Sequence, residues 1–282
     1  MPVKITRMVE SDIEGAIDCI QKAFAQDPYF AWVFSENVRI YTICLFTISN
    51  YTTHTSSLDS VWSVSNINCH AKKFSPARNR VSLGIRCRWG LEHALFYVAK
   101  DPSSSTPSRV LGVACWLPPT NASASQSWKS WFGDWSLWFN QLWMNSVYGR
   151  GGLNVRRYYI WFVCPKKWLC DVLIVSDHRT CRKAAQSDAQ RQLWTDDQGY
   201  YFCNIVTVLP EAQGMGIGKE LFGVVMRQAD AEGRKCYLES SRAEPNMAIY
   251  RKMGFELAKE MKCDDQGTAI TLYCMMREPR SD

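Results

Sequence analysis

The stretch Gln213-Gly214-Met215-Gly216-Ile217-Gly218, entered from an apolar run at 204–208, is the part of the chain that decides the fold. The run is β-branched and apolar enough for a buried strand, and Pro210 ends it because proline lacks the N–H that a ladder needs. Glycine at every second position of the stretch allows a sharp turn and a close approach by a ligand. A helix is predicted from about Lys219. Free N–H groups at such a helix start form a site for a pyrophosphate.

A glycine loop by itself also fits a turn in an unrelated α/β domain. This loop lacks the Lys-Ser/Thr of a Walker loop, and Gln213 stands where a dinucleotide-binding loop has glycine. A second motif follows downstream, with Asn246, Tyr250 and Gly254-Phe255 at spacings of four residues. A strand is predicted between the two motifs, over 235–240.

The two motifs together resemble the landmarks of the GNAT superfamily of N-acetyltransferases, and among its members the fungal-type small-molecule acetyltransferases. The first landmark, Gln/Arg-x-x-Gly-x-Gly/Ala after a strand, matches at Gln213, Gly216 and Gly218. The second, Asn-x-x-x-Tyr-x-x-x-Gly-Phe, begins at Asn246. The resemblance covers 199–278 well, 3–36 plausibly and 74–118 in part.

The resemblance implies an α+β fold, in which helices flank a mixed, mostly antiparallel sheet. We expect a single acetyltransferase domain over 1–282, with core segments 3–36, 74–118 and 183–278. Local patterns predict a strand at 3–8, a helix opened by a capping box at 11–14, and a helix at 183–193. They also predict strands at 79–89, 93–100 and 109–117, and a final hairpin of 255–262 with 268–276.

The segment 120–161 is a predicted helical insertion rich in tryptophan. Its large apolar residues recur at spacings of three and four, which is one face of a helix; they are Trp128, Trp131, Trp135, Trp138 and Leu142. The stripe is either a core-facing surface or a lid whose aromatic side chains wall the acceptor pocket.

Two segments, 38–72 and 162–182, do not fit the patterns around them. The first is rich in Ser and Thr, and neither shows a clean period. The flanking sequence would join sensibly without them. Natural sequences rarely interrupt consistent local patterns in this way, so we hypothesise that both are translated introns. The alternative is a pair of surface loop insertions.

Composition excludes several classes of protein. The formal net charge of +6 is modest and the Lys and Arg residues are scattered, which argues against nucleic-acid binding. The apolar runs are shorter than the ~20 residues of a membrane span, and the N-terminus has no signal-peptide pattern. We therefore expect a cytoplasmic protein with reduced cysteines and no membrane partner. The Cys and His spacings predict no metal site.

The resemblance also implies a co-substrate, acetyl-coenzyme A, and the residues that bind it. Its pyrophosphate is expected on the glycine loop, and its pantetheine arm beside a strand that splays from its neighbour. Asn246 matches a position that hydrogen-bonds the cofactor arm, and a helix-start cap is its alternative. The predicted cofactor-binding residues are Val206, Thr207, Val208, Gln213, Gly214, Met215, Gly216, Ile217, Gly218, Lys219, Asn246 and Tyr250.

Two residues are predicted to be catalytic. Tyr250 matches the family position that protonates the departing thiolate, although a packed helical tyrosine is the alternative. Some family members carry a glutamate on the signature strand, but Phe202 and Asn204 stand at the nearest positions here. Glu239, on the following strand, is therefore the candidate general base, and a surface carboxylate is its alternative. Cys203 is expected to be a small buried residue and not an acyl carrier.

The function that follows is an acetyl-coenzyme A-dependent N-acetyltransferase, which transfers the acetyl group directly to a primary amine in a ternary complex. The aromatic insertion favours a small-molecule amine as the acceptor. Two alternatives stay open: acetylation of protein or peptide lysines or N-termini, and a non-catalytic coenzyme A-binding domain. The sequence leaves the oligomeric state unknown.

Overall fold

The computed structural model describes residues 3–34, 74–103, 109–119, 128–153, 193, 199–265 and 267–280. The side chains of 128–135, 138 and 265 are not described. The two anomalous segments, 38–72 and 162–182, lie outside these residues, as does nearly all of the helix predicted at 183–193. No helix in the described part of the chain is long and apolar enough to span a membrane.

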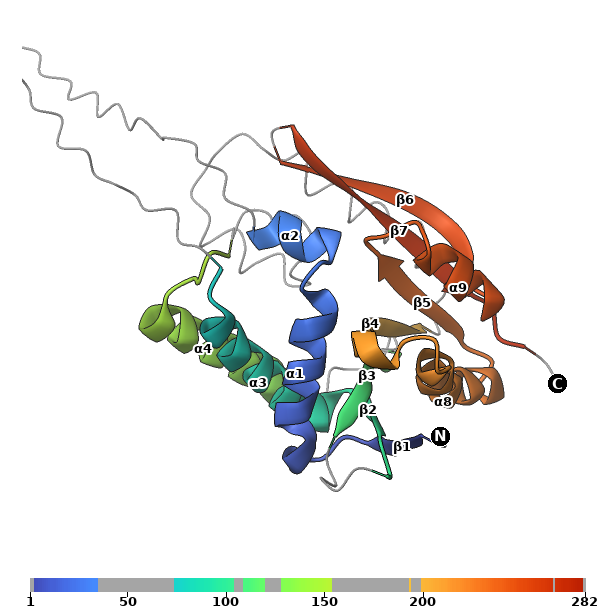
Figure 1. The fold of residues 1–282 in the computed structure, drawn as a ribbon, viewed down its shortest axis with the longest axis horizontal. Helices are drawn as coiled ribbons and strands as arrows, with labels where there is room; N and C mark the ends of the chain where they lie inside the picture. Colours follow the sequence, from blue (N-terminus) through green and yellow to red (C-terminus); the bar gives the residue numbers. More distant parts are fainter. Residues whose placement is uncertain are drawn as a thin grey trace, which may run out of the picture.

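A mixed sheet forms the centre of the molecule (Figure 1). Its strand order is β1-β2-β3-β4-β5-β7-β6, and the only parallel pair among the described strands is β4 with β5. This confirms the predicted α+β class with a mostly antiparallel sheet. The strands are β1 Lys4–Arg7, β2 Leu95–Lys100, β3 Val110–Leu117, β4 Tyr200–Val208, β5 Lys235–Ser240, β6 Glu256–Asp265 and β7 Thr268–Arg277.

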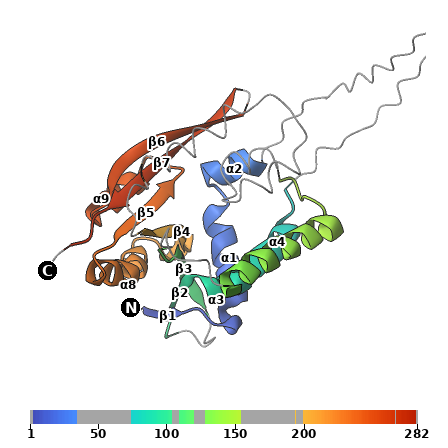
Figure 2. The same ribbon diagram turned by 180° about the vertical axis from the view of Figure 1, so that it is seen from behind.

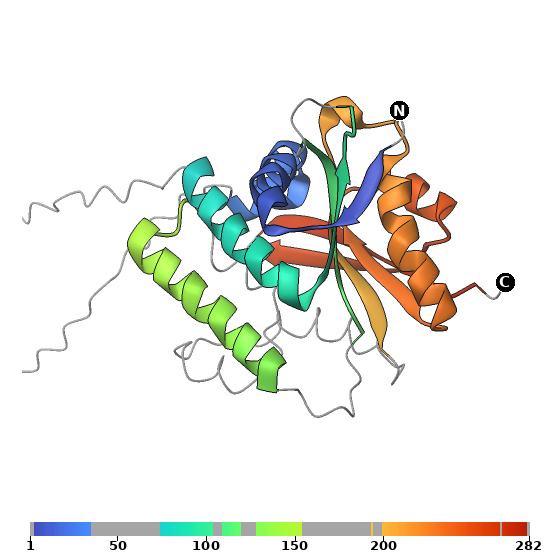
Figure 3. The ribbon, with the colours of Figure 1, turned by 90° about the horizontal axis from the view of Figure 1, so that it is seen from below.

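Helices cover both faces of the sheet. Figures 2 and 3 show α1, α3 and α4 on one side of β1 to β4, with α8 on the other side. Near β5, β6 and β7 lie α2 and α9. The bounds are α1 Ile13–Phe24, α2 Pro28–Phe34, α3 Pro76–His93, α4 Trp128–Tyr148, α8 Ile217–Ala231 and α9 Asn246–Lys252, and Glu10–Asp12 and Pro210–Ala212 form short 3-10 turns.

The larger hydrophobic core joins α1 and α8 to the strands β2 to β5. Trp116 of β3 is fully buried, and its ring meets the edge of Phe222 from α8 at a centroid distance of 5.2 Å. The apolar face of α8 is buried as its helical period predicts, because its members recur every three or four residues. This core fixes the height and angle of α8, and therefore the position of the glycine loop before it.

A second, smaller core lies between α2 and the hairpin of β6 and β7. Trp32 of α2 is 5% exposed, and its indole N–H donates to the carbonyl oxygen of Thr268 at 2.9 Å. Tyr237 of β5 and the partly buried Tyr200 and Phe202 of β4 belong to the same cluster. Alternate residues of β5 therefore face different cores, since successive side chains of a strand point to opposite faces.

The strand predicted at 79–89 is wrong, because these residues form the middle of helix α3. Ser75 caps this helix by accepting a hydrogen bond from the backbone N–H of Arg78 at 3.3 Å, and Pro76 occupies its first turn. Small and polar residues on α3, including Asn79 and Ser82, are buried, so the helix has no apolar stripe to detect.

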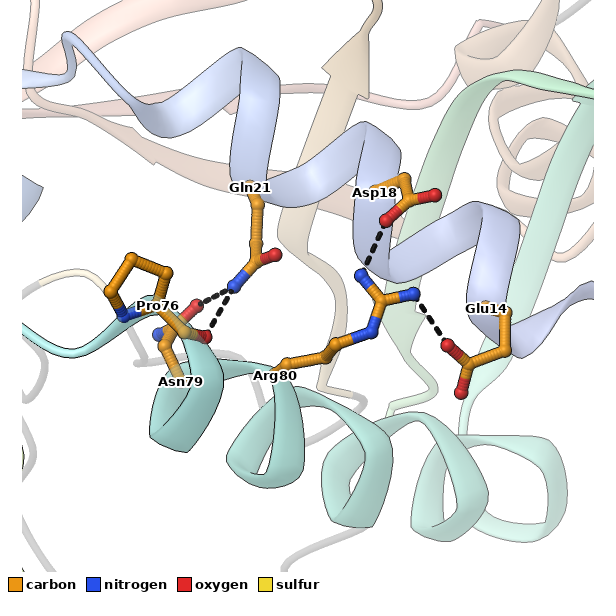
Figure 4. Close-up of polar contacts among 6 residues, drawn as sticks. All are labelled: Glu14, Asp18, Gln21, Pro76, Asn79 and Arg80. Carbon is orange, nitrogen blue, oxygen red and sulfur yellow. Dashed lines mark hydrogen bonds and ion pairs between the residues drawn. The ribbon is translucent and has the colours of Figure 1, made fainter.

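Polar contacts between α1 and α3 explain the composition of that face (Figure 4). The guanidinium of Arg80 donates to the carboxylates of Asp18 and Glu14, each at 2.5 Å. The Gln21 amide donates to the Asn79 side chain at 2.9 Å and to the Pro76 carbonyl oxygen at 3.0 Å. The two helices are thus held by hydrogen bonds where an apolar seam would otherwise be expected.

The start of α1 also differs from the predicted capping box at 11–14. Asp12 is the residue before the helix, and it makes no side-chain cap. Its carboxylate accepts from the backbone N–H of Val9 at 3.1 Å and lies 2.7 Å from the Lys100 ammonium. Asp12 is 1% exposed. A buried charge needs a partner, and the ion pair with β2 outweighs a local capping bond.

The helix predicted within 120–161 is confirmed as α4, which ends before Gly149 at φ 66°. Leu142 is 48% exposed, whereas Met144 is fully buried. At this end of α4, the face that packs against the rest of the protein therefore contains Met144 and not Leu142. The structure does not describe the side chains of the four tryptophans in the stripe predicted from the sequence. Arg78 fastens the end of α4 to α3 through Asn145 at 2.5 Å and the Gly149 carbonyl oxygen at 3.2 Å.

Candidate active site

The parallel strands β4 and β5 separate in the middle of the sheet. Their pairing runs from Tyr200 with Lys235 to Cys203 with Leu238 and goes no further. Beyond Cys203, β4 continues to Val208 against β3. The β5-facing backbone groups of 204–208 therefore have no ladder partner in β5, and they can hydrogen-bond a ligand that enters the gap.

A bulge in β4 coincides with this separation. Cys115 of β3 pairs with Ile205 and the next residue, Trp116, pairs with Cys203, so Asn204 is the extra residue. A bulge bends its strand and increases the local twist. The bulge thus bends β4 at the point where its pairing with β5 ends.

The glycine loop presents backbone to open space. Gly214 and Gly216 have φ values of 82° and 78°, and a Cβ atom added to either would meet no atom within 4 Å. Glycine is therefore required at both by the left-handed conformation and not by crowding within the chain. Helix α8 begins at Ile217, two residues before the predicted start at Lys219.

The start of α8 has free N–H groups, as every helix does, because the first backbone bond within it runs from Glu220 N to the Gly216 carbonyl oxygen at 3.2 Å. Lys219 is exposed on this first turn, and Met215 is 49% exposed beside it. The Gln213 side-chain amide donates to the Val208 carbonyl oxygen at 3.3 Å. Gln213 therefore braces the loop against the end of β4 with its side chain.

Thr207 faces α1 and not the loop. It is 5% exposed, and its hydroxyl lies 3.5 Å from the Cys19 sulfur. Its side chain is thus committed to the core, and only its backbone can meet a ligand. Val206 and Val208 are partly buried against the larger core. Chemistry at this strand must therefore come from main-chain groups.

Tyr250 of α9 packs against the aromatic side chains of the larger core. Its ring centroid lies 5.7 Å from that of Phe222 and 6.3 Å from that of Phe255. Burial raises the pKa of Tyr250 above its usual value, and the negative charge of Asp27 acts in the same direction. The phenol is therefore protonated at neutral pH, which is the form that can donate a proton.

Asn246 fastens the start of α9 to the end of β5. Its amide donates to the Ser240 hydroxyl at 3.1 Å, and that hydroxyl donates to the Arg242 carbonyl oxygen at 2.9 Å. Asn246 does not cap the helix, since Pro245 is the residue before it. Its side chain shapes the turn that carries Tyr250.

Glu239 and Leu238 point to opposite faces of β5. Glu239 lies on the face that carries the smaller core. Its carboxylate accepts a hydrogen bond from the Tyr237 hydroxyl at 2.8 Å. Burial raises the pKa of Cys263 to about 12, and the charge of Glu239 adds to that shift. The carboxylate is thus held among aromatic and thiol groups, with Cys274 as its neighbour across the β5–β7 ladder.

Tyr250 and Glu239 thus approach β5 from different sides. Tyr250 belongs with the larger core, together with Leu238, whereas Glu239 follows Tyr237 into the smaller one. Cys203 is 5% exposed, and burial raises the pKa of its thiol well above the usual range. It is therefore a neutral core residue, as expected.

Two residues near the gap were not predicted as part of the site. Asp27, between α1 and α2, accepts from the Phe30 backbone N–H at 3.0 Å and from the Ser241 hydroxyl at 2.6 Å. Ser241 directly follows β5. The Asp-Pro pair at 27–28 signals a helix start, but no local pattern joins it to a serine 214 residues away.

No metal cluster is found in the described ranges: they hold no group of three or more His, Cys, Asp and Glu side chains arranged to bind an ion. The predicted site residues contribute main-chain amides of β4 and of the glycine loop, the Tyr250 phenol and the Glu239 carboxylate. This set is suited to a substrate with a pyrophosphate, a carbonyl and an amine.

Residues 184–257 match the family model described as acetyltransferase (GNAT) domain. No curated protein matches the sequence. Among solved structures, a Corynebacterium glutamicum protein described as histone acetyltransferase HPA2 and related acetyltransferase aligns with a TM-score of 0.53 and 14% identity, over 100% of this chain and 99% of its own.

Two other solved structures align over nearly the whole chain with lower scores. The Sinorhizobium meliloti phosphinothricin acetyltransferase in complex with acetyl-coenzyme A has a TM-score of 0.44 and 14% identity, over 99% of this chain and 89% of its own. The Escherichia coli ribosomal-protein-S18-alanine N-acetyltransferase has a TM-score of 0.44 and 9% identity, over 100% and 97%.

The likeness to the C. glutamicum structure shows the same fold, and the family model matches the segment that carries the glycine loop and the gap. The match to a GNAT acetyltransferase domain is thus confined to residues 184–257, and the likeness to the solved structure extends the same fold over the whole chain.

Proposed function

We propose that the protein transfers an acetyl group from acetyl-coenzyme A to the primary amine of a small molecule, by direct transfer in a ternary complex. The observation that carries this proposal is the separation of β4 from β5 after Cys203, next to a glycine loop that leads into α8. Acetyl-coenzyme A supplies an activated acetyl group as a thioester. The residues around the gap fit such a ligand, because they offer unpaired main-chain groups and a helix start.

The loop 213–218 and the first turn of α8 would hold the pyrophosphate through backbone N–H groups. Glycine at 214 and 216 leaves space there, as the open surroundings of their missing Cβ atoms indicate. The main chain of 206–208 would bind the pantetheine arm and donate to the thioester carbonyl oxygen, where negative charge develops during attack. Asn246 would support the same arm from the end of β5.

In the reaction, the amine nitrogen attacks the thioester carbonyl carbon, a C–N bond forms and the C–S bond breaks. Glu239, directly or through water, would accept the proton that the ammonium or amine gives up. Tyr250 would donate its hydroxyl proton to the departing thiolate and recover a proton afterward. A phenol suits this role because it is protonated at neutral pH even at its usual pKa of about 10.

The aromatic side chains near Glu239 support a compact, partly apolar acceptor. Tyr237 packs on Phe202 and Tyr200 at centroid distances of 5.5 and 5.6 Å, and Trp32 belongs to the same cluster. Such side chains form broad rigid surfaces. A lysine-rich peptide would instead favour an open groove lined with acidic residues.

The test is turnover by the full chain with acetyl-coenzyme A and a panel of 2-phenylethylamine, tryptamine, spermidine and a lysine-containing tetrapeptide. We expect the small amines to be acetylated faster than the peptide. A higher kcat/KM for the peptide would contradict the small-molecule assignment, and the absence of turnover with every amine would contradict the proposed function.

The role of Tyr250 is tested by Tyr250→Phe in the same assay. We expect kcat to fall by about 100-fold or more, which is the usual contribution of a general acid. Calorimetric binding of acetyl-coenzyme A should be unchanged, because the ring that packs on Phe222 is kept. An unchanged kcat would refute the assignment of Tyr250 as the acid.

A further inference from the structure

Glu239 is the first residue of β5 beyond the last pair with β4. The pairing of the two strands ends at Cys203 with Leu238, and the next residue of β4, Asn204, is the extra residue of the bulge. On its other side, Glu239 pairs with Cys274 of β7. The residue proposed as the general base therefore stands at the edge of the gap, where the parallel strands begin to separate.

The hydroxyl of Tyr237 holds the carboxylate of this residue. It donates a hydrogen bond to Glu239 Oε1 at 2.8 Å. The two residues are two positions apart on β5, so their side chains leave the strand on the same face. A glutamate side chain is long and rotates freely unless it is bonded. The bond from Tyr237 thus limits the directions that the Glu239 carboxylate can take.

The donor is itself fixed by packing. Tyr237 is 2% exposed, and its ring lies 5.5 Å from that of Phe202 and 5.6 Å from that of Tyr200, measured between centroids. Both neighbours belong to β4, on the near side of the last strand pair. The place of the Tyr237 hydroxyl is therefore set by the smaller core and does not depend on its bond to Glu239.

The smaller core that Glu239 faces holds other titratable side chains, which are Tyr200 of β4, Cys274 of β7, Cys263 of β6 and Tyr29 of α2. Burial raises the pKa of Cys274 to about 11 and that of Cys263 to about 12. Phenols and thiols of this kind keep their protons at neutral and acidic pH. Lys259 stands opposite Cys274 on β6 and adds a positive charge on the same face, which is also constant in this range. A change of charge at acidic pH in this group of side chains therefore belongs to Glu239.

We propose that Tyr237 is a positioning residue for the general base: its hydroxyl fixes the Glu239 carboxylate at the edge of the gap and keeps it ionised. This inference rests on the proposed function. Tyr237 acts through Glu239 and not on the substrate. Its hydrogen bond favours the charged carboxylate over the neutral acid, because an ionised acceptor forms the stronger bond. Tyr237 thus extends to lower pH the range in which Glu239 can accept the proton of the amine.

The test is the pH dependence of kcat/KM for Tyr237→Phe, measured with acetyl-coenzyme A and the amine of the panel above that gives the highest kcat/KM. Phenylalanine keeps the ring that packs on Phe202 and Tyr200 and removes only the hydroxyl. We expect the low-pH limb of the profile to move by about one unit to higher pH, because the lost bond favours the ionised form by about a factor of ten. The kcat/KM above this limb should fall by at most about tenfold, since the base is still present.

Two further variants show whether Tyr237 acts through Glu239. Glu239→Gln should lose the low-pH limb and lower kcat/KM by about 100-fold or more. Adding Tyr237→Phe to Glu239→Gln should change kcat/KM no further, because the effects of two residues that act as one unit do not add. The matched control is Tyr201→Phe, which removes another buried hydroxyl that donates to a carboxylate, that of Glu232 at 2.6 Å after the end of α8. Its pH profile should match that of the wild type.

A low-pH limb that stays in place in Tyr237→Phe, although Glu239→Gln removes it, would overturn this inference and leave the proposed function standing. A further loss when the two changes are combined, or an equal shift in Tyr201→Phe, would also overturn it, because either would indicate an effect on the fold. If the wild type acetylates amines and Glu239→Gln has the same profile, Glu239 is not the base; this inference then fails while acetyl transfer stands. A wild type that acetylates no amine would refute the proposed function and this inference together.

Discussion

At the scale of single residues, conformation and chemistry make separate demands on the glycine loop. Gly216 and Gly233 stand at the two ends of α8, with φ values of 78° and 64°. A Cβ atom at either meets nothing within 4 Å. Both therefore carry the same conformational requirement, but only Gly216 lies in the loop that faces the predicted ligand.

We expect Gly216→Ala and Gly233→Ala each to lower the free energy of unfolding by about 1 kcal/mol, because alanine is strained in the left-handed region. Only Gly216→Ala should also weaken binding of acetyl-coenzyme A. Urea unfolding and calorimetric titration of both variants make the comparison. Equal acetyl-coenzyme A affinity in the two variants would argue against a cofactor site at this loop.

Asn246 and Asp27 illustrate how far a residue's type predicts its partner. Asn246 was expected to contact the cofactor or to cap a helix, and its amide binds Ser240. Asp27 caps α2 through the Phe30 backbone N–H, and its second oxygen reaches Ser241. The local role of such residues can be predicted from neighbouring residues, whereas the long-range partner depends on the fold.

At the scale of elements, an ion pair fastens β7 to α8. Arg277 is 4% exposed, and its guanidinium meets the carboxylate of Asp230 in two parallel bonds of 2.7 Å each. Asp230 also accepts from the backbone N–H of Arg280 at 2.8 Å. These bonds hold the pKa of Asp230 below its usual value, with the Arg277 hydrogen bonds as the largest cause.

Because the folded-state pKa of Asp230 is lowered, its stabilising contribution is present above the unfolded-state pKa of about 3.9. The contribution is lost as the pH falls through the lower, folded-state pKa. We expect Asp230→Asn to lower the free energy of unfolding by about 3 kcal/mol at pH 7, because Arg277 is left buried without its anion.

Urea unfolding at several pH values between 7 and 2 checks this prediction. The difference between wild type and Asp230→Asn should shrink as the pH falls below about 4. A matched control is Glu211→Gln, whose partner Arg109 is 50% exposed, and which should change stability little at any pH. If the difference in the free energy of unfolding between the wild type and Asp230→Asn does not depend on pH, the stabilising role of the Asp230 carboxylate is contradicted.

At the scale of the whole molecule, the described residues on either side of the segment 38–72 lie side by side. Phe34, at the end of α2, and Phe74, just before α3, have ring centroids 4.9 Å apart at an interplanar angle of 70°. Phe30 lies at 4.9 Å from the same Phe74 ring. A short connection could therefore join these positions, as the hypothesis of a translated intron requires.

We expect a version of the chain without 38–72 to unfold cooperatively and to bind acetyl-coenzyme A at least as tightly as the full chain. Loop shortening changes closure entropy only slowly with length, so the cost of removing the segment is small. Calorimetric titration of the full chain, this version, and one that also lacks 162–182 makes the comparison. Binding by the full chain alone would overturn the prediction, and a cDNA that retains both segments would contradict their origin as introns.

The sequence alone was sufficient for the part of the fold that depends on local signals. The strand 235–240, the final hairpin and the helix after the glycine loop follow from side-chain period and from turn residues, which act within a few positions of one another. The α+β class follows from their order and from the two motifs. Glycine at 214 and 216 was predictable for the same reason, because a left-handed turn selects its residue locally.

Only the tertiary structure decided which distant groups share a site. Helix α3 was mistaken for a strand because its buried face is polar. A partner for that face comes from a distant part of the chain, since Gln21 of α1 donates to Asn79. The bulge at Asn204 and the separation of β4 from β5 depend on pairing with β3 and β7. The bond from Ser241 to Asp27 spans 214 residues. Such contacts form because packing brings separate elements together, and no pattern within one element specifies them.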